Sequence, residues 1–156
     1  MSPTPVRFYD PGDTLSQFSA SVLVRCPRCE RIAHFERRPC SAADADADGR
    51  RYPQTRVICR SCGLCRISTG PSRCYRPPLW LQTETRHGQL WAYNLRHLDL
   101  IRRFVAADLR ERAPWDDHGR KMTLVARLPA WGKSAKNRDE ILRTVDRLRA
   151  SVIAPG

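Results

Sequence analysis

The chain has 156 residues, which suits one compact domain or a small metal module joined to a second small unit. Its formal net charge of +12, from 28 Lys and Arg against 16 Asp and Glu, favours a polyanionic partner such as nucleic acid. No apolar run is long enough to span a membrane, no apolar signal core follows Met1, and the seven cysteines are an odd number, so the sequence predicts a cytoplasmic protein.

The first 20 residues contain prolines and a glycine without hydrophobic periodicity. This composition predicts a flexible N-terminal arm over residues 1–20, to which we assign no chemistry.

Residues 21–76 have the composition of a small β module. Short alternating or apolar runs predict four strands, at residues 21–25, 32–36, 55–58 and 66–69. Between the second and the third lies an insertion at residues 39–53, whose alternating Ala and Asp residues are typical of a solvated excursion.

Two C-x2-C pairs lie in this module, Cys26 with Cys29 and Cys59 with Cys62. Two residues between cysteines let both thiolates reach one ion, and two such turns complete a tetrahedron, so the pairs predict one structural Zn²⁺. Gly63 follows the second pair, at a position that often turns with positive φ, which glycine adopts without steric cost.

Other assignments of the cysteines remain open from the sequence. The pairs also suit a redox dithiol or disulfides, and Cys65 is an alternative to Cys62 that gives a looser loop. Cys40 and Cys74 have no partner at ligand spacing, and His34 is a more distant substitute ligand.

After Pro77-Pro78, the segments 79–85 and 90–93 predict a hairpin around His87-Gly88. Trp91 and Tyr93 then share a face, either as core residues or as platforms for stacked bases. Asn94 is suited to cap a helix over residues 95–112, whose apolar stripe needs a sheet to cover it.

Beyond that helix, Asp116, Asp117 and His118 offer the alternative of a metal-dependent nuclease corner.

The C-terminal segment carries +6 of the net charge of +12. Residues 118–156 contain nine Lys and Arg against three acids. Asn137 and Glu140 predict a capping box that opens a helix running to about residue 150.

Bases crowd this helix start, although the helix dipole favours acids there. A bound phosphate explains them, and the predicted nucleic-acid contacts are Lys133, Ser134, Lys136, Arg138 and Arg147, with Trp131 as a stacking residue. Asp139 and Glu140 support the alternative that the helix start is neutralised internally.

The two knuckles, CPRC and CRSCG, resemble the zinc ribbon of the transcription factor IIB type. The segments PLWLQTETRHGQLWAYNLRHLDLIRRFVAADLRER and LPAWGKSAKNRDEILRTVDRLR resemble the body of small bacterial zinc-ribbon-containing proteins. The resemblance covers residues 22–150 without the insertion, and it implies a structural zinc and a link to nucleic acid or transcription. Glu30 in place of the knuckle glycine, the long insertion and Cys65 depart from the ribbon pattern.

Together these features predict an α+β fold: an N-terminal zinc ribbon of short antiparallel strands, then a β-hairpin and two principal helices over residues 77–150, with a basic segment at 118–150. The predicted function is non-enzymatic binding of DNA or RNA through that segment, related to transcription. The alternatives are an adaptor that docks on a protein of the transcription or ribosomal machinery and, less favoured, a metal-dependent hydrolase or nuclease.

Overall fold

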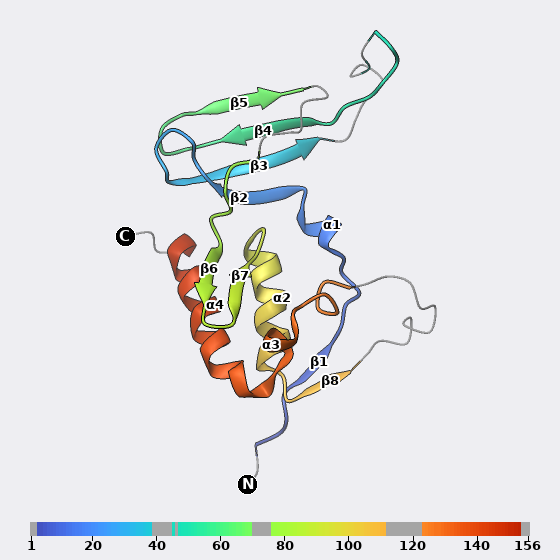
Figure 1. Cartoon of the computed structure of the whole chain (residues 1–156), viewed down its shortest axis with the longest axis vertical. Coiled ribbons are helices and arrows are strands. Elements are labelled where there is room, and N and C mark those ends of the chain that lie inside the picture. Colours follow the sequence, from blue (N-terminus) through green and yellow to red (C-terminus); the bar gives the residue numbers. More distant parts are fainter. Residues whose placement is uncertain (1–2, 39–44, 46, 70–75, 112–122, 154–156) are drawn as a thin grey trace.

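The computed structural model describes residues 3–38, 45, 47–69, 76–111 and 123–153. In Figure 1, a four-stranded sheet forms one end of the molecule, and a hairpin with two long helices forms the body. The fold is therefore mixed α and β, with antiparallel pairing in the large sheet and in the hairpin.

The sheet at the end of the molecule consists of four consecutive antiparallel strands, in the order β2 (Ser21–Arg25), β3 (Ile32–Arg38), β4 (Gln54–Ile58) and β5 (Cys65–Ser68). The four predicted strands are confirmed to within two residues at each end. Their alternating apolar side chains form one buried cluster, which includes Val22, Val24, Ala33, Phe35 and Val57.

The edge strand β2 joins this sheet to the body. The backbone N–H of Leu23 donates to the Tyr93 carbonyl at 2.7 Å, and the N–H of Trp80 donates to the Leu23 carbonyl at 2.9 Å. The N–H of Arg25 donates to the Pro78 carbonyl at 2.8 Å. The inner edge of the sheet is therefore paired, and Figure 1 shows β5 at the far side of the sheet.

The body consists of the hairpin β6 (Gln82–Thr85) and β7 (Gly88–Trp91) with the helices α2 (Leu95–Ala106) and α4 (Arg138–Ile153). The apolar stripes of the helices meet the hairpin in the main hydrophobic core, whose fully buried members include Leu81, Leu98, Leu100, Ile101, Ile141 and Val145. The hairpin is therefore the sheet that was expected to cover the apolar stripe of α2.

In the hairpin, side chains share a face as predicted, but the two strands pair in another register than a His87-Gly88 turn would give. Gln82 lies opposite Trp91 and Thr85 opposite Gly88, which leaves Arg86 and His87 in the turn. The Thr85 hydroxyl fixes this turn by donating to the Gly88 carbonyl and accepting from the His87 N–H. A two-residue shift keeps each side chain on its face.

The N-terminal residues are packed rather than forming the expected arm. Strand β1 (Arg7–Tyr9) pairs in parallel with β8 (Leu109–Glu111), and the short helix α1 (Leu15–Phe18) follows. Phe8 and Phe18 are only 4% and 1% exposed, because they complete the main core.

Helix α2 ends at Ala106, six residues before the predicted end. Asn94 caps its start as predicted, accepting from the His97 N–H at 2.9 Å. At the other end Ala107 is extended, and the chain enters β8 because it pairs there with β1.

Two short helices, α3 (Ala130–Lys133) and the 3-10 turn η3 (Ala135–Asn137), lead into α4. Within the described residues, no helix has both the length and the apolar character needed to cross a bilayer.

Candidate metal centre

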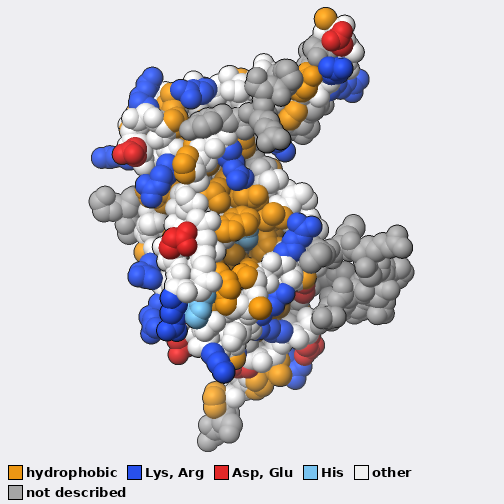
Figure 2. All heavy atoms as spheres, viewed as in Figure 1, with side chains coloured by type: hydrophobic (Ala, Val, Ile, Leu, Met, Phe, Trp, Pro, Cys, Tyr) orange, Lys and Arg blue, Asp and Glu red, His pale blue; other side chains and the backbone are white. Residues whose placement is uncertain are grey.

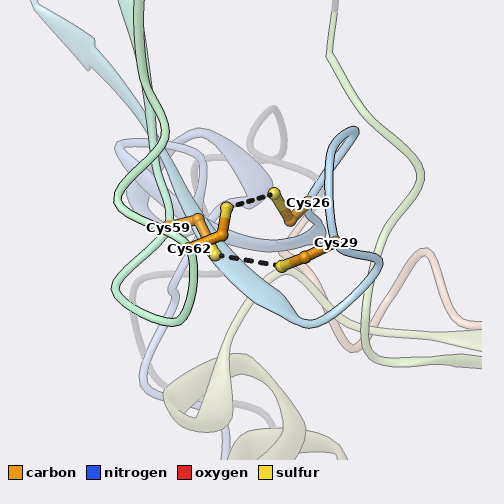
Figure 3. Close-up of side chains that lie close together, drawn as sticks. All are labelled: Cys26, Cys29, Cys59 and Cys62. Atoms are coloured by element: carbon orange, nitrogen blue, oxygen red, sulfur yellow. Dashed lines mark hydrogen bonds between the residues drawn. The ribbon is translucent and has the colours of Figure 1, made fainter.

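The four predicted ligands meet at the end of the sheet (Figure 3). The sulfur atoms of Cys26, Cys29, Cys59 and Cys62 all lie within 4.8 Å of one another. The Sγ atoms of Cys26 and Cys62, and those of Cys29 and Cys59, are 3.6 Å apart. These distances exceed an S–S bond of about 2.05 Å, and they match the edge of about 3.8 Å in a tetrahedron with Zn–S bonds of about 2.3 Å. The cluster can therefore hold one metal ion, and its all-sulfur donor set fits zinc.

The two knuckles have the same backbone hydrogen bonds. The N–H of Cys26 donates to the Arg31 carbonyl and that of Cys59 to the Leu64 carbonyl, both at 2.8 Å. One residue in each knuckle also turns with positive φ, Gly63 at 72° and Glu30 at 61°. Glu30 therefore adopts the glycine conformation that its side chain disfavours, and the knuckle geometry is conserved between the two turns despite this departure from the ribbon pattern.

Without metal, the thiols share protons unequally. Burial opposes ionisation of Cys26, but the backbone N–H groups of Cys29 and Arg28 and the other thiols lower its pKa to about 6. For Cys29 the N–H of Arg31 lowers the pKa, but burial and the three neighbouring sulfurs outweigh it and raise the pKa to about 12. A divalent cation relieves this competition by replacing the protons.

Cys65 lies outside the cluster, exposed in β5, so Cys62 is the member of the second knuckle that joins the other three. His34 lies in β3 opposite Ile58 and is not part of the cluster. Cys40, Cys74 and the Asp116–His118 corner lie outside the described residues.

Arginine dominates the charge around the metal centre. Residues 21–38 and 54–69 contain eight Arg and two Glu. One ion pair forms among the described residues here, between Arg56 and Glu36 at 2.6 Å. Seven of the eight are exposed and have no carboxylate partner among the described residues of this sheet: Arg25, Arg28, Arg31, Arg37, Arg38, Arg60 and Arg66. Figure 2 shows basic side chains on this end of the molecule.

The predicted C-terminal contacts divide into two groups. Lys133 donates to the Ala126 carbonyl at 2.6 Å. Arg138 pairs with Asp108 at 2.7 Å and donates to the Ala107 carbonyl at 3.0 Å. The Ser134 N–H donates to the Trp131 carbonyl at 3.4 Å. These three residues therefore hold the chain around α3 in place.

The other predicted residues are less engaged. Lys136 is exposed, and Arg147 is exposed with one hydrogen bond, to the Thr144 hydroxyl. Trp131 is half-buried and stacks on His87 with ring centroids 6.0 Å apart. The predicted nucleic-acid contacts therefore stay a prediction, in which Lys136 and Arg147 are the exposed members.

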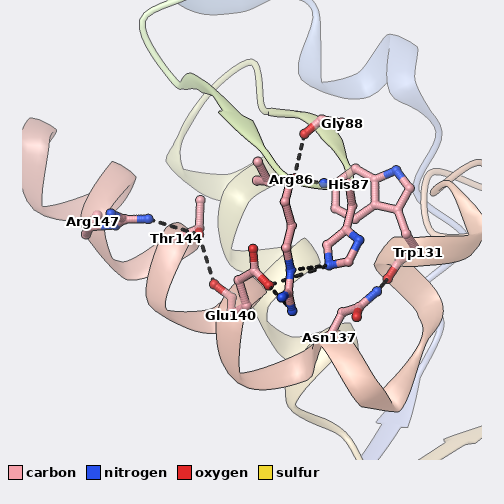
Figure 4. A network of polar contacts seen from close by, with 9 residues as sticks. Arg86, His87, Gly88, Trp131, Asn137, Glu140, Thr144 and Arg147 are labelled. Carbon is pink, nitrogen blue, oxygen red and sulfur yellow. Dashed lines mark hydrogen bonds and ion pairs between the residues drawn. The ribbon is translucent and has the colours of Figure 1, made fainter.

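The side chains of Glu140 and Asn137 make contacts other than those of the predicted capping box (Figure 4). The Glu140 carboxylate pairs with Arg86 at 2.8 Å and lies 3.5 Å from His87. The Asn137 side chain donates to the Trp131 carbonyl. The sequence did not predict this link between the hairpin turn and α4. The predicted turn was His87-Gly88, whereas the observed turn is Arg86-His87 and so contains Arg86.

Comparisons with protein-family models, with curated proteins and with solved structures give no match to this chain. The fold and the cysteines therefore define its class by themselves: a mixed α and β protein with a four-cysteine cluster that can hold a metal ion.

Proposed function

We propose that the protein is a zinc ribbon of the transcription factor IIB type that binds nucleic acid and performs no chemistry at its metal. The observation that carries this proposal is the excess of exposed, unpaired arginines around the metal centre. Four thiolates around one Zn²⁺ also leave no position open for a substrate.

The charge balance supports a polyanionic partner. Eight Arg and two Glu leave the described ribbon with a net charge of +6. Four thiolates with Zn²⁺ add a formal charge of about −2, so an excess remains after the metal is counted. Phosphates are the natural partners of such a surface, because guanidinium groups bind them with paired hydrogen bonds.

The ribbon arginines are proposed as the principal contact with nucleic acid, in place of the C-terminal segment that the sequence predicted. Lys136 and Arg147 remain proposed phosphate contacts, since both are exposed. Lys133, Ser134 and Arg138 are proposed to position the segment, because their hydrogen-bond and ion-pair partners are protein atoms.

A salt series tests the proposal. Binding to duplex and single-stranded DNA and RNA is measured for the zinc-loaded protein and for the triple variant R28Q/R60Q/R66Q. Each lost phosphate contact reduces the slope of log affinity against log salt by about 0.9 on a duplex, so the triple variant is expected to lose about 2.7.

The matched control is R96Q/R102Q/R103Q on α2. It removes the same charge from arginines that have the carboxylate partners Asp13, Asp146 and Asp99. We expect the control to bind like the original protein. Equal losses in both triple variants, or a salt-independent affinity, would contradict the proposed surface.

The second candidate is an adaptor, favoured by the far edge of the ribbon. All four residues of β5 are exposed, with Ile67 at 56%, and no described strand pairs with its outer edge. An extended segment of a partner can pair there by strand addition. Capture of a partner that survives nuclease and moderate salt, and is lost in Ile67→Lys, would favour the adaptor over nucleic-acid binding.

A further inference from the structure

An apolar cavity of about 110 Å³ lies in the body, away from the metal centre. Its walls come from β7, α2, the segment 124–132 and α4. Figure 2 shows hydrophobic side chains gathered in the middle of this face of the molecule. An engineered apolar cavity of about 150 Å³ stays dry and binds benzene, so this volume is on the scale of one ring.

One buried side chain in the wall is polar. His97 is 2% exposed, and its ring is surrounded by Phe18, Trp91 and Tyr93 at centroid distances of 5.1, 5.6 and 5.7 Å. Burial lowers the pKa of His97 to about 4, so the ring is neutral at physiological pH.

Its hydrogen bonding fixes which nitrogen carries the proton. The Tyr93 backbone N–H donates to Nδ1 at 3.1 Å, so Nδ1 is the acceptor and Nε2 holds the hydrogen. Among the described residues, Nε2 has no hydrogen-bond partner. Nε2 is not among the fully buried polar atoms that lack a partner, so its N–H is open to the cavity that His97 lines, where a bound acceptor can pair with it.

The rest of the lining decides the class of ligand. Gln89 and Arg127 are exposed at the cavity, and the other lining residues are Leu, Ile, Val, Pro, Trp and Gly. Among the described residues that line the cavity there is no carboxylate, which disfavours a cation. A water needs two to four polar partners, and this apolar lining supplies few.

We infer that the cavity binds a small, neutral, ring-sized organic molecule whose polar group is a hydrogen-bond acceptor, and that this acceptor meets the Nε2–H of His97. An aromatic ketone has this chemistry. The site is independent of the metal and of the proposed nucleic-acid surface.

The probe pair is acetophenone and ethylbenzene, which have similar shapes and differ in the carbonyl oxygen. The full, zinc-loaded chain labelled with ¹⁵N is titrated with each, and the His97 Nε2–H and tryptophan indole N–H resonances are followed. Acetophenone is expected to shift the Nε2–H resonance and to bind about tenfold more tightly than ethylbenzene. Equal affinities, no binding of either probe, or tighter binding of benzoate than of acetophenone would overturn the inference.

Two variants separate the hydrogen bond from the cavity. His97→Phe keeps a ring but removes the donor, so it should bind both probes equally. Because it also leaves the Tyr93 N–H unpaired, Val105→Phe serves as the second variant: it adds a ring at the cavity wall and should abolish binding of both. Unchanged acetophenone binding in folded Val105→Phe would place the ligand elsewhere and refute the site.

Discussion

Glu30 is a residue in a conformation that suits glycine. Its φ of 61° matches the 72° of Gly63 in the other knuckle, and a non-glycine residue pays about 1–2 kcal/mol for it. Glycine also costs up to about 1 kcal/mol of extra unfolded-state entropy. We therefore expect Glu30→Gly to stabilise the zinc-loaded protein by about 0.5–1 kcal/mol in denaturant unfolding.

The matched control is Gly63→Ala. A methyl group at Gly63 would have no atom within 4 Å, so the substitution tests backbone conformation without a steric clash. On the same balance of conformational cost and unfolded-state entropy, it should destabilise by about 0.5–1 kcal/mol. If Glu30→Gly is destabilising while Gly63→Ala is neutral, the left-handed turn is not what limits knuckle stability.

His97 gives the fold a pH dependence. Its pKa is about 4 in the folded protein and about 6.5 when unfolded, so between these values the unfolded chain binds a proton that the folded one does not. Stability is therefore lost as pH falls from 6.5 to 4, by up to about 3 kcal/mol. His97→Gln should remove this component, seen as a shallower fall in unfolding free energy over that range.

The four cysteine ligands act in the same pH range, since protons displace the metal. Both proteins contain the same cysteines, so the difference between them isolates His97. Parallel curves for the two proteins would show that His97 titrates normally in the fold.

At the scale of elements, the strands β2 to β5 were predictable because local signals set them. Alternating side chains define each strand, and the cysteine spacing places the knuckles between them. The register of the hairpin was not predictable from the turn residues, because it depends on the hydroxyl of Thr85. Strands β1 and β8 were missed because each is three residues long and its partner lies about 100 residues away in sequence.

The gathering of the four cysteines was also predictable, whereas the predicted nucleic-acid contacts stay a prediction. Cysteine spacing reports directly on a shared ion. Lys133 and Arg138 donate hydrogen bonds to the backbone carbonyls of Ala126 and Ala107, and no pattern of side chains in the sequence reveals these contacts. His97 had one signal, a histidine inside the apolar stripe of α2, but its free nitrogen is visible only in the fold.

Asp108 connects three elements. Its carboxylate accepts from the Val6 N–H at 3.1 Å and pairs with Arg138 at the start of α4, and these contacts lower its pKa. Asp108→Ala should release β1, with about tenfold faster amide exchange at residues 7–9. Asp99→Ala, which breaks exposed pairs with Arg103 and Arg149, is the control and should leave those amides unchanged. Equal exchange in both variants would show that Asp108 does not anchor β1.

At the scale of the whole molecule, the cysteine cluster and the body belong to different buried clusters. Cys26 and Cys59 belong to the buried cluster of the sheet β2–β5, whereas α2, α4 and the hairpin share the main core. Structural zinc contributes about 10–16 kcal/mol of apparent binding free energy. Chelation should therefore abolish amide protection in β3, β4 and β5 while α2 and α4 keep theirs, as measured by hydrogen exchange.

Two serine variants check which sulfurs matter. Cys59→Ser should lose the metal, and Cys65→Ser should retain one zinc per chain by elemental analysis. Simultaneous loss of protection in the ribbon and the helices on chelation would mean that the chain unfolds as one unit.

The parallel pairing of β1 with β8 sets an order of assembly during synthesis. Val6 and Asp108 are 102 positions apart, so at roughly 5–20 residues per second the first strand waits about 5–20 s for its partner to be translated. Both knuckles are translated before β8 and α4 after it, so the four sulfur atoms can come together before β1 meets its partner, and α4 is the last element to be added.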